Sequence, residues 1–524
     1  MSHGHHDEHS GHSCSCCTGS QRAALAALSR REFMLSVGAT AAIGATAGTK
    51  EAAGAADAPA AARPKIAPAT DVVVQPVLTY FVPQRREQTS WRPWGGIQTQ
   101  AQAAEEVRRI EQELRALVTA NGLAVKVLPV AEARNAQDAG RIAQTPCDIM
   151  LVYASGGGRD TIEALVSPER PSLFFLRHNP GPVSLWYEII HPHMLRKATD
   201  DYKQPGVDVN DVVVDDIAEL AWKLRALAAL RKTRGQRIVA VGGAGGWGQG
   251  HQLAPPFARE RWQLDIRDVS YDDLGKRIRS LRKDSAAVEA ARRDAAAYLA
   301  QPNVRSEIDT KPVENAFVLT RAFKDLLKEN DARAMTIQHC MGTVMPISET
   351  TACLPLSLLN DEGYLAFCES DFVVIPSGML MHHITGLPVF LNDPTWPHDG
   401  VVTVAHCTAP RKMDGKTCEP VRLLTHFESD YGAAPKVEFR VGQVATNVVP
   451  DFASRKWVGF TGKVIDNPFL DICRSQTDIR IDGDWKRLLA DMRGFHWMMV
   501  YGDCCREVGY AIRHVGIEWE NISA

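Results

Sequence analysis

Apolar and polar positions along the chain predict strands and helices in alternation. Residues 72–80 form an apolar run, as expected of a buried strand. In residues 101–120, Ala, Val, Ile and Leu recur at helical intervals with charged residues between them, which predicts a helix. Asn121-Gly122 ends that pattern. The runs that follow predict strands at 124–128, 148–153 and 172–176 and a long helix at 216–232. This β-α-β rhythm is typical of a doubly wound, mostly parallel sheet.

A second unit with the same rhythm begins at residues 237–241, so we place a boundary near Arg234-Gly235. It continues with a strand near 262–268 and helices over 271–300 and 313–329. After Gly400 the chain changes to Val/Thr/Arg-rich alternation with frequent turns, which predicts antiparallel strands. The expected fold is α/β: two doubly wound parallel-sheet domains, then a C-terminal α/β region with an antiparallel β part. The expected divisions are 1–68, 69–234, 235–350 and 351–524.

The first 68 residues differ in character from the rest. Arg30-Arg31 precedes a weakly apolar, Ala/Gly-rich stretch at 35–48, which resembles a twin-arginine export signal. Residues 49–68 are rich in Ala and Pro, as in a cleavage region and linker. A His/Cys-rich tract at 1–20 has metal-binding composition but lies in a segment that export removes. We therefore expect a periplasmic protein that uses the twin-arginine machinery, or a membrane-anchored one if the signal is uncleaved.

Composition excludes several classes of function. The 524 residues carry a net charge of −3 without a basic stripe, so a nucleic-acid partner is not expected. No apolar run beyond residue 60 approaches the roughly 18 residues that a membrane span needs. Nine cysteines lie beyond the N-terminal region without C-x-x-C pairs, and their odd number disfavours a disulfide framework. We interpret most of them as small buried hydrophobic residues.

A glycine-rich loop at 243–248 admits two readings. It follows a predicted strand and fits G-x-G-x-x-G, and Asp265 lies where a ribose-binding carboxylate is found, so an NAD-dependent oxidoreductase is one alternative. That motif requires a helix to begin inside the glycines, facing the pyrophosphate. The continuation at 249–256, with Pro255-Pro256, is a poor helix start. We therefore interpret the segment as a glycine-rich active-site loop.

Three candidate ligands each follow a predicted strand. Glu369 follows the strand at 364–368, Asp393 follows that at 389–391, and His406 follows that at 401–405. We expect these to be three successive parallel strands that present Glu369, Asp393 and His406 at their carboxyl ends, where open α/β sheets bind ligands. Singly, each has a structural explanation as a helix cap or a core histidine. Together, two carboxylates and an imidazole make the mixture that a hard divalent cation prefers.

The surrounding motifs resemble the L-fucose isomerase family. They are Cys-Glu-Ser-Asp at 368–371, Gly-Met-Leu-Met-His-His-Ile-Thr-Gly at 378–386 and Val-Phe-Leu-Asn-Asp at 389–393. That family has a Glu after one strand, an Asp after the next, and a Met-rich helix ending in Thr-Gly between them. The resemblance implies that Glu369 and Asp393 are both metal ligands and the acid–base groups. It extends over most of residues 71–524 and is strongest at 353–410 and 494–505.

The family's third ligand is a histidine ahead of an apolar strand near the C-terminus, which corresponds here to His496. The resemblance implies an aldose–ketose isomerase that acts on a free monosaccharide through an enediol, and a homo-oligomer. Two carboxylates and one imidazole favour Mn²⁺ or another divalent cation. His406 and Trp247 are secondary candidates for sugar binding. The alternative is an exported, non-catalytic sugar- or metal-binding protein with the same fold. Export favours this alternative, whereas the presence of two acid–base carboxylates disfavours it.

Overall fold

The computed structural model describes residues 71–92, 96–179, 181–183, 206–248 and 250–523. The twin-arginine motif, the His/Cys-rich tract and the linker predicted for residues 1–68 lie outside these residues. Among the described helices, none combines the length and the apolar character that crossing a membrane requires.

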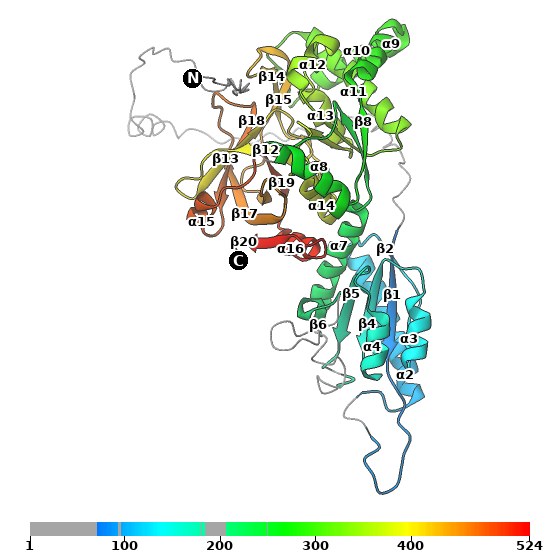
Figure 1. Ribbon diagram of the computed structural model, residues 1–524. Helices are drawn as coiled ribbons and strands as arrows, with labels where there is room; N and C mark the ends of the chain where they lie inside the picture. Colours follow the sequence, from blue (N-terminus) through cyan, green and yellow to red (C-terminus); the bar gives the residue numbers. More distant parts are fainter. Residues whose placement is uncertain (1–70, 93–95, 180, 184–205, 249, 524) are drawn as a thin grey trace, which may run out of the picture. The chain divides into compact units, whose positions relative to one another are not determined.

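The first sheet is parallel, with the strand order β2-β1-β4-β5-β6 and with β3 also paired to β1 (Figure 1). Its strands are β1 (Val72–Thr79), β2 (Val125–Val127), β3 (Ala131–Ala133), β4 (Ile149–Ala154), β5 (Ser172–Leu176) and β6 (Val212–Val214). The connecting helices are α2 (Gln100–Asn121), α3 (Ala136–Ala143), α4 (Gly158–Leu165) and the 3₁₀ helix η2 (Val209–Asp211), and α7 (Ile217–Thr233) follows β6. Helix α2 ends at Gly122 with φ 57°, as the Asn-Gly pair predicts.

The second sheet is also parallel, with the order β11-β10-β7-β8. Its strands are β7 (Arg237–Val241), β8 (Asp265–Val269), β10 (Ala334–Ile337) and β11 (Leu365–Cys368). Its helices are α8 (Gly250–Arg261), α9 (Tyr271–Lys283), α10 (Ser285–Leu299), α11 (Thr310–Glu329), α12 (Cys340–Ser348), α13 (Cys353–Asp361) and α14 (Ile375–Thr385). This sheet continues past residue 350 through β11, and the division of the chain into domains stays a prediction.

The C-terminal region contains a closed six-stranded antiparallel barrel, ordered β16-β19-β12-β13-β18-β17 and closed by the pairing of β17 with β16. Its strands are β12 (Phe390–Pro394), β13 (Val401–His406), β16 (Val444–Pro450), β17 (Lys456–Asp466), β18 (Ser475–Ile481) and β19 (Trp497–Tyr501). Strand β20 (Glu518–Asn521) pairs parallel with β17. A separate small sheet contains β9 (Val304–Ser306), β14 (Val421–His426) and β15 (Tyr431–Val437). Helices α15 (Trp485–Ala490) and α16 (Cys505–Arg513) complete the region. The predicted combination of parallel α/β sheets with a C-terminal antiparallel part is confirmed.

One prediction about the strands is wrong. We expected the strands before Glu369, Asp393 and His406 to be three successive parallel neighbours. Only β11 lies in a parallel sheet, whereas β12 and β13 pair antiparallel, with Asp393 opposite Ala405. Residues 395–400 alone connect β12 to β13, and a parallel crossover needs about a dozen residues or more.

Helix α14 brings the parallel sheet and the barrel together, through a glycine that permits close contact. A Cβ atom on Gly378 would lie 2.6 Å from Met498 Cε on β19 and 2.9 Å from Phe367 Cε1 on β11. The helix therefore packs tightly on the ends of both strands. Because Glu369 follows β11 and His496 precedes β19, this packing places the two candidate ligands close together.

Candidate metal centre

Glu369 is aimed by a strained turn at the end of β11. Glu369 and Ser370 have φ angles of 62° and 47°, a region that non-glycine residues adopt rarely. Hydrogen bonds hold this turn: the Ser370 amide donates to Thr336 Oγ1 at 3.0 Å, and the Phe372 amide donates to the Gly245 carbonyl at 3.1 Å. Such strain persists only where surrounding contacts fix it, and it is common at functional sites.

The barrel supplies the other candidate ligands from adjacent strands. Asn392 on β12 lies opposite Trp497 on β19, so their sequence neighbours Asp393 and His496 meet at one rim. His406 ends β13, beside Ala405, which pairs with Asp393. Antiparallel pairing therefore assembles the group that we expected from parallel strands.

His496 lies between the two candidate carboxylates. Its Nε2 atom is 3.5 Å from Glu369 Oε2 and 3.4 Å from Asp393 Oδ1, and its side chain is 0% exposed. Neither His496 Nε2 nor Asp393 Oδ1 has a hydrogen-bond partner. The Glu369 and Asp393 side chains are 29% and 34% exposed. The cluster is thus buried on the imidazole side and open to a ligand on the carboxylate side.

Asp371 fixes the orientation of the His496 ring. Its Oδ2 atom lies 2.8 Å from His496 Nδ1, and both side chains are fully buried. A carboxylate that accepts the Nδ1 proton leaves the Nε2 lone pair facing Glu369 and Asp393. A lone pair directed at two carboxylates is unfavourable without a positive charge between them, so the donor set fits a divalent cation. The sequence places Asp371 with Glu369 at the end of this strand, within the motif at 368–371, but sequence analysis gave Asp371 no role in the site.

His406 joins the same cluster from β13. Its Nε2 atom lies 3.6 Å from Glu369 Oε1, and its Nδ1 atom lies 2.9 Å from Thr408 Oγ1. Asp393, His406 and His496 offer ligand atoms that all lie within 4.8 Å of one another, and Cys368, Glu369 and His406 do the same. The described residues therefore include groups able to hold a metal ion: His406 belongs to both, Glu369 to one, and Asp393 with His496 to the other.

The electrostatics of the cluster favour a positive charge. Burial lowers the pKa of His496, but the charge of Asp393 and the hydrogen bond to Asp371 outweigh it and raise that pKa to about 9. Burial likewise lowers the pKa of His406, and the contacts with Glu369 and Asp393 reverse the effect and raise it. Burial raises the pKa of Glu369, but His406 and His496 lower it to about 2. A protonated His496 thus balances the carboxylates where no cation is bound.

The glycine-rich loop places Trp247 beside the cluster. The Trp247 ring stacks on Phe495 with centroids 4.5 Å apart and lies 6.1 Å from the His496 ring. Trp247 is 36% exposed and Phe495 is 44% exposed, so the pair forms an open aromatic wall. A Cβ atom on Gly246 would lie 2.7 Å from the Gly250 carbonyl oxygen, which explains why the loop needs glycine there.

The same loop lacks the geometry of a dinucleotide site. Helix α8 does form despite its two prolines, contrary to our expectation, but it begins at Gly250, after the glycines. The loop instead pairs with the turn after β11, through a bridge between Gly245 and Asp371. Asp265 is engaged by Arg237 and Arg267, each at 2.7 Å. The bridge places the loop beside the candidate metal centre.

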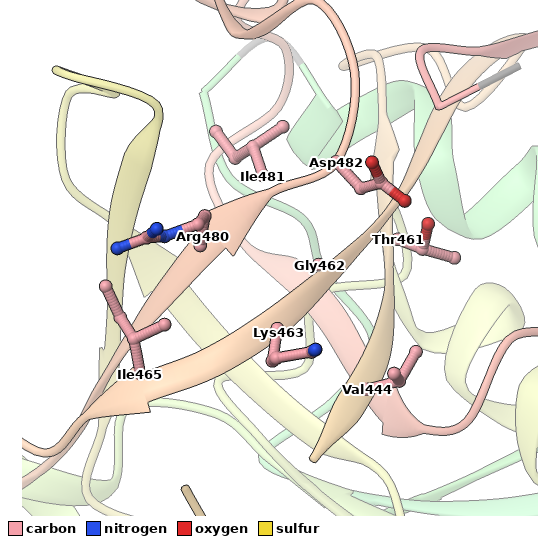
Figure 2. Close-up of a pocket in the computed structure, with 8 residues that line it drawn as sticks. All are labelled: Val444, Thr461, Gly462, Lys463, Ile465, Arg480, Ile481 and Asp482. Atoms are coloured by element: carbon pink, nitrogen blue, oxygen red, sulfur yellow. The ribbon is translucent and has the colours of Figure 1, made fainter. Parts of the chain in front are cut away.

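A separate cavity of about 530 Å³ lies against β16, β17 and β18 (Figure 2). Its charged lining side chains are Lys463, Arg480 and Asp482. None of the predicted site residues lines it, and its lining offers no histidine and no second carboxylate.

Comparison with known proteins does not add to the assignment, because no protein-family model and no curated protein matches this chain.

Proposed function

We propose that this protein is a metal-dependent aldose–ketose isomerase whose chemistry is similar to that of L-fucose isomerases. Glu369, Asp393 and His496 are its metal ligands, and Mn²⁺ suits this oxygen-rich donor set. One observation supports the proposal most. The His496 Nε2 atom has no hydrogen-bond partner and lies 3.5 Å from a Glu369 oxygen and 3.4 Å from an Asp393 oxygen. The twin-arginine motif supports an exported enzyme.

The reaction moves a proton between C1 and C2 of an open-chain sugar and needs no external oxidant or reductant. A bound divalent cation supplies stabilisation of the negative charge that develops on the substrate oxygens. Of Glu369 and Asp393, one takes the proton from carbon, and the other moves a proton between O1 and O2. Asp371 holds the His496 ring in place, and Trp247 with Phe495 offers a stacking surface for the sugar.

Purified full-length protein tests the proposal directly. The protein is stripped with a chelator, Mn²⁺ is added back, and ketose formation is assayed over a panel of aldoses. Glu369→Gln is compared with Glu105→Gln, which changes an exposed carboxylate on α2. Turnover that requires metal and disappears only in Glu369→Gln supports the isomerase. Metal binding without turnover of any aldose favours the binding-protein alternative, and an absence of metal binding overturns the ligand assignment.

A further inference from the structure

A second group of metal-ligating side chains lies next to the candidate metal centre, and we name it the thiol cluster. Its members are Cys353, Cys407, His426 and Cys473. Cys353 begins α13, Cys407 follows β13, His426 ends β14, and Cys473 lies shortly before β18. Four segments that are distant in sequence therefore converge on one point.

Three of the four members of the thiol cluster lie close together and are buried, and the fourth, Cys473, is partly buried against them. The ligand atoms of Cys353, Cys407 and His426 all lie within 4.8 Å of one another, and all three residues are buried. Cys353 and Cys407 pack in one cluster, and Cys473 packs against it. Tetrahedral zinc with Zn–S bonds of about 2.3 Å sets its sulfur atoms roughly 3.8 Å apart. Cys353, Cys407 and His426 therefore need only a small contraction to hold an ion, and Cys473, which packs against them, would complete the set.

Hydrogen bonds outside the cluster orient its members. His426 Nδ1 lies 3.1 Å from Ser429 Oγ, so Nε2, which lies 4.0 Å from Glu428 Oε2, is the atom that would bind a cation. The Arg474 amide donates to Cys407 Sγ at 3.4 Å. Such outer contacts are typical of metal sites, where they fix the tautomer of a histidine and stabilise thiolates.

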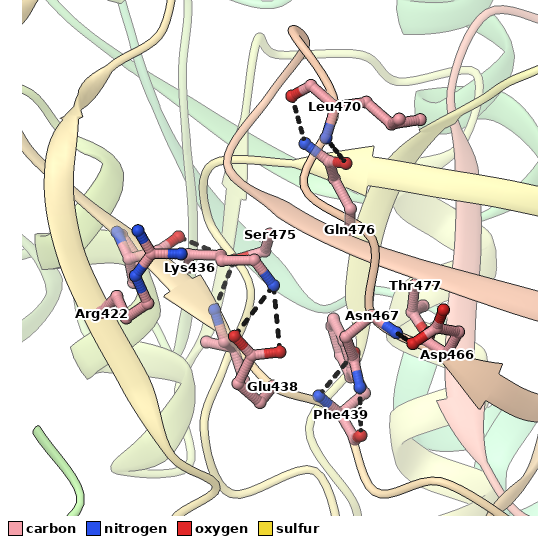
Figure 3. A network of polar contacts seen from close by, with 12 residues as sticks. Arg422, Lys436, Glu438, Phe439, Asp466, Asn467, Leu470, Ser475, Gln476 and Thr477 are labelled. Atoms are coloured by element: carbon pink, nitrogen blue, oxygen red, sulfur yellow. Dashed lines mark hydrogen bonds and ion pairs between the residues drawn. The ribbon is translucent and has the colours of Figure 1, made fainter. Parts of the chain in front are cut away.

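The loop that carries Cys473 is also fixed in place. Gln476 Nε2 donates to the carbonyl oxygens of Leu470 and Cys473, both at 2.9 Å, and Gln476 Oε1 accepts from the Leu470 amide at 2.7 Å. Figure 3 shows the two hydrogen bonds between Gln476 and Leu470. One buried side chain therefore holds both ends of the short segment that presents the third thiol.

Neither a plain apolar core nor a disulfide accounts for the whole group. Small buried hydrophobes need no imidazole beside them, and a disulfide uses two thiols and leaves the third thiol and the histidine unexplained. Three thiols and one imidazole together make the ligand set of a structural zinc site.

We propose that Cys353, Cys407, Cys473 and His426 form a closed tetrahedral site for a soft or borderline cation, with Zn²⁺ as the best fit. All four positions are filled by protein atoms, so the site is structural and leaves no place for a substrate. Because Cys407 directly follows His406, the bound ion fixes the rim of the neighbouring centre. This inference does not depend on the isomerase reaction.

Cobalt titration tests the site in reduced, chelator-stripped full-length protein that carries Cys14→Ser, Cys16→Ser and Cys17→Ser, because thiolates of the His/Cys-rich tract at 1–20 would otherwise bind Co²⁺ as well. Cobalt held by thiolates shows strong charge-transfer absorption in the near ultraviolet, which Glu369, Asp393 and His496 alone do not produce. We expect one equivalent of Co²⁺ to give this band and Zn²⁺ to remove it. Cys407→Ser should weaken Co²⁺ binding by at least about 100-fold, since loss of an outer contact alone costs about 10- to 100-fold. Cys504→Ser is the matched control: it removes a buried thiol outside the cluster and should leave the band unchanged.

A measurement on the parent protein covers the case in which Cys407→Ser does not fold. The reduced, metal-free protein is alkylated with and without Zn²⁺, and the modified peptides are identified by mass spectrometry. Zn²⁺ should protect Cys353, Cys407 and Cys473 but not Cys147, which is partly exposed in the connection before β4. The proposal is overturned if the parent protein gives no thiolate–cobalt band or if Zn²⁺ protects none of the three. Isomerase activity that persists in that case separates this failure from a failure of the proposed function.

Discussion

Two clusters of side chains adjoin the end of β13, and they differ in the atoms that they offer. His406 belongs to the candidate metal centre, with its carboxylate oxygens, and the next residue, Cys407, belongs to the thiol cluster. The Glu369 and Asp393 carboxylates are about a third exposed, whereas Cys353 and Cys407 are buried. Hard oxygen ligands with an open side suit an ion that acts on a substrate, and a closed set of sulfur ligands suits an ion that holds the fold. One strand end therefore contributes side chains to two candidate metal sites.

The largest effect that separates the two clusters is expected from Glu369→Gln. This change removes a ligand charge and an acid–base group, so kcat for Mn²⁺-dependent ketose formation should fall by at least about 10³-fold. The thiolate–cobalt band should be unchanged in the same variant. If the band is also lost, the two clusters are one coupled site and the comparison fails.

A smaller effect is expected from Asp371→Asn, which keeps the size of the side chain but removes its charge. Asp371 orients His496 from outside the ligand set, so Mn²⁺ affinity should fall by about 10- to 100-fold. Titration of the stripped protein with Mn²⁺, followed by electron paramagnetic resonance, measures this loss. Asp294→Asn on the exposed side of α10 is the control. Unchanged Mn²⁺ affinity in Asp371→Asn would show that the His496 ring is held by packing instead.

Local pattern predicted much of the fold but not the closure of the barrel. The apolar run at 72–80, the amphipathic stretch at 101–120 and the Asn121-Gly122 ending correspond to β1, α2 and its left-handed cap. The antiparallel pairing of β12 and β13 was predictable from the short connection at 395–400 and was missed. The pairing of β16 with β17 that closes the barrel depends on long-range packing, which no local pattern encodes.

The two clusters differ in how much of them the sequence reveals. Glu369 and Asp393 follow apolar runs within recognisable motifs, so they were predicted as ligands, and the structure brings them together with His496. Asp371 is linked to His496 across 125 positions, and only the folded chain identifies that contact. The thiol cluster draws its members from residues 353, 407, 426 and 473 without a C-x-x-C spacing, so no motif indicates it.

The pH dependence of stability allows loss of metal from the candidate metal centre to be distinguished from unfolding of the protein. Burial, followed by the charges of His382, Lys232 and Arg333, lowers the pKa of His383 from 6.5 to about 3. The unfolded chain therefore binds a proton below about pH 6.5 that the folded chain does not, and stability falls as the pH decreases from 6.5 toward 3. We expect the free energy of unfolding of the stripped protein to fall by about 1 kcal/mol per pH unit in this window from His383 alone.

Urea unfolding of the stripped protein between about pH 7 and pH 5 measures this slope. His383→Gln should reduce the slope, because glutamine binds no proton in this range. An unchanged slope in that variant would assign the acid sensitivity to other groups. If Mn²⁺ is released at a higher pH than the pH at which the protein unfolds, the release can then be attributed to the metal centre itself.

The smallest predicted effect concerns the aromatic wall. Trp247→Ala should raise KM for the preferred aldose by about 2- to 10-fold, since a stacked aromatic contact contributes about 0.5–1.5 kcal/mol. Mn²⁺ affinity and the thiolate–cobalt band should stay as in the parent protein. Trp247 also lowers the pKa of Glu369 through a hydrogen bond, and Trp247→Phe separates this role from stacking because it keeps a ring but loses the indole N–H. If Phe restores KM, the wall acts on the sugar; if Mn²⁺ affinity falls in both variants, Trp247 acts on the metal centre through Glu369.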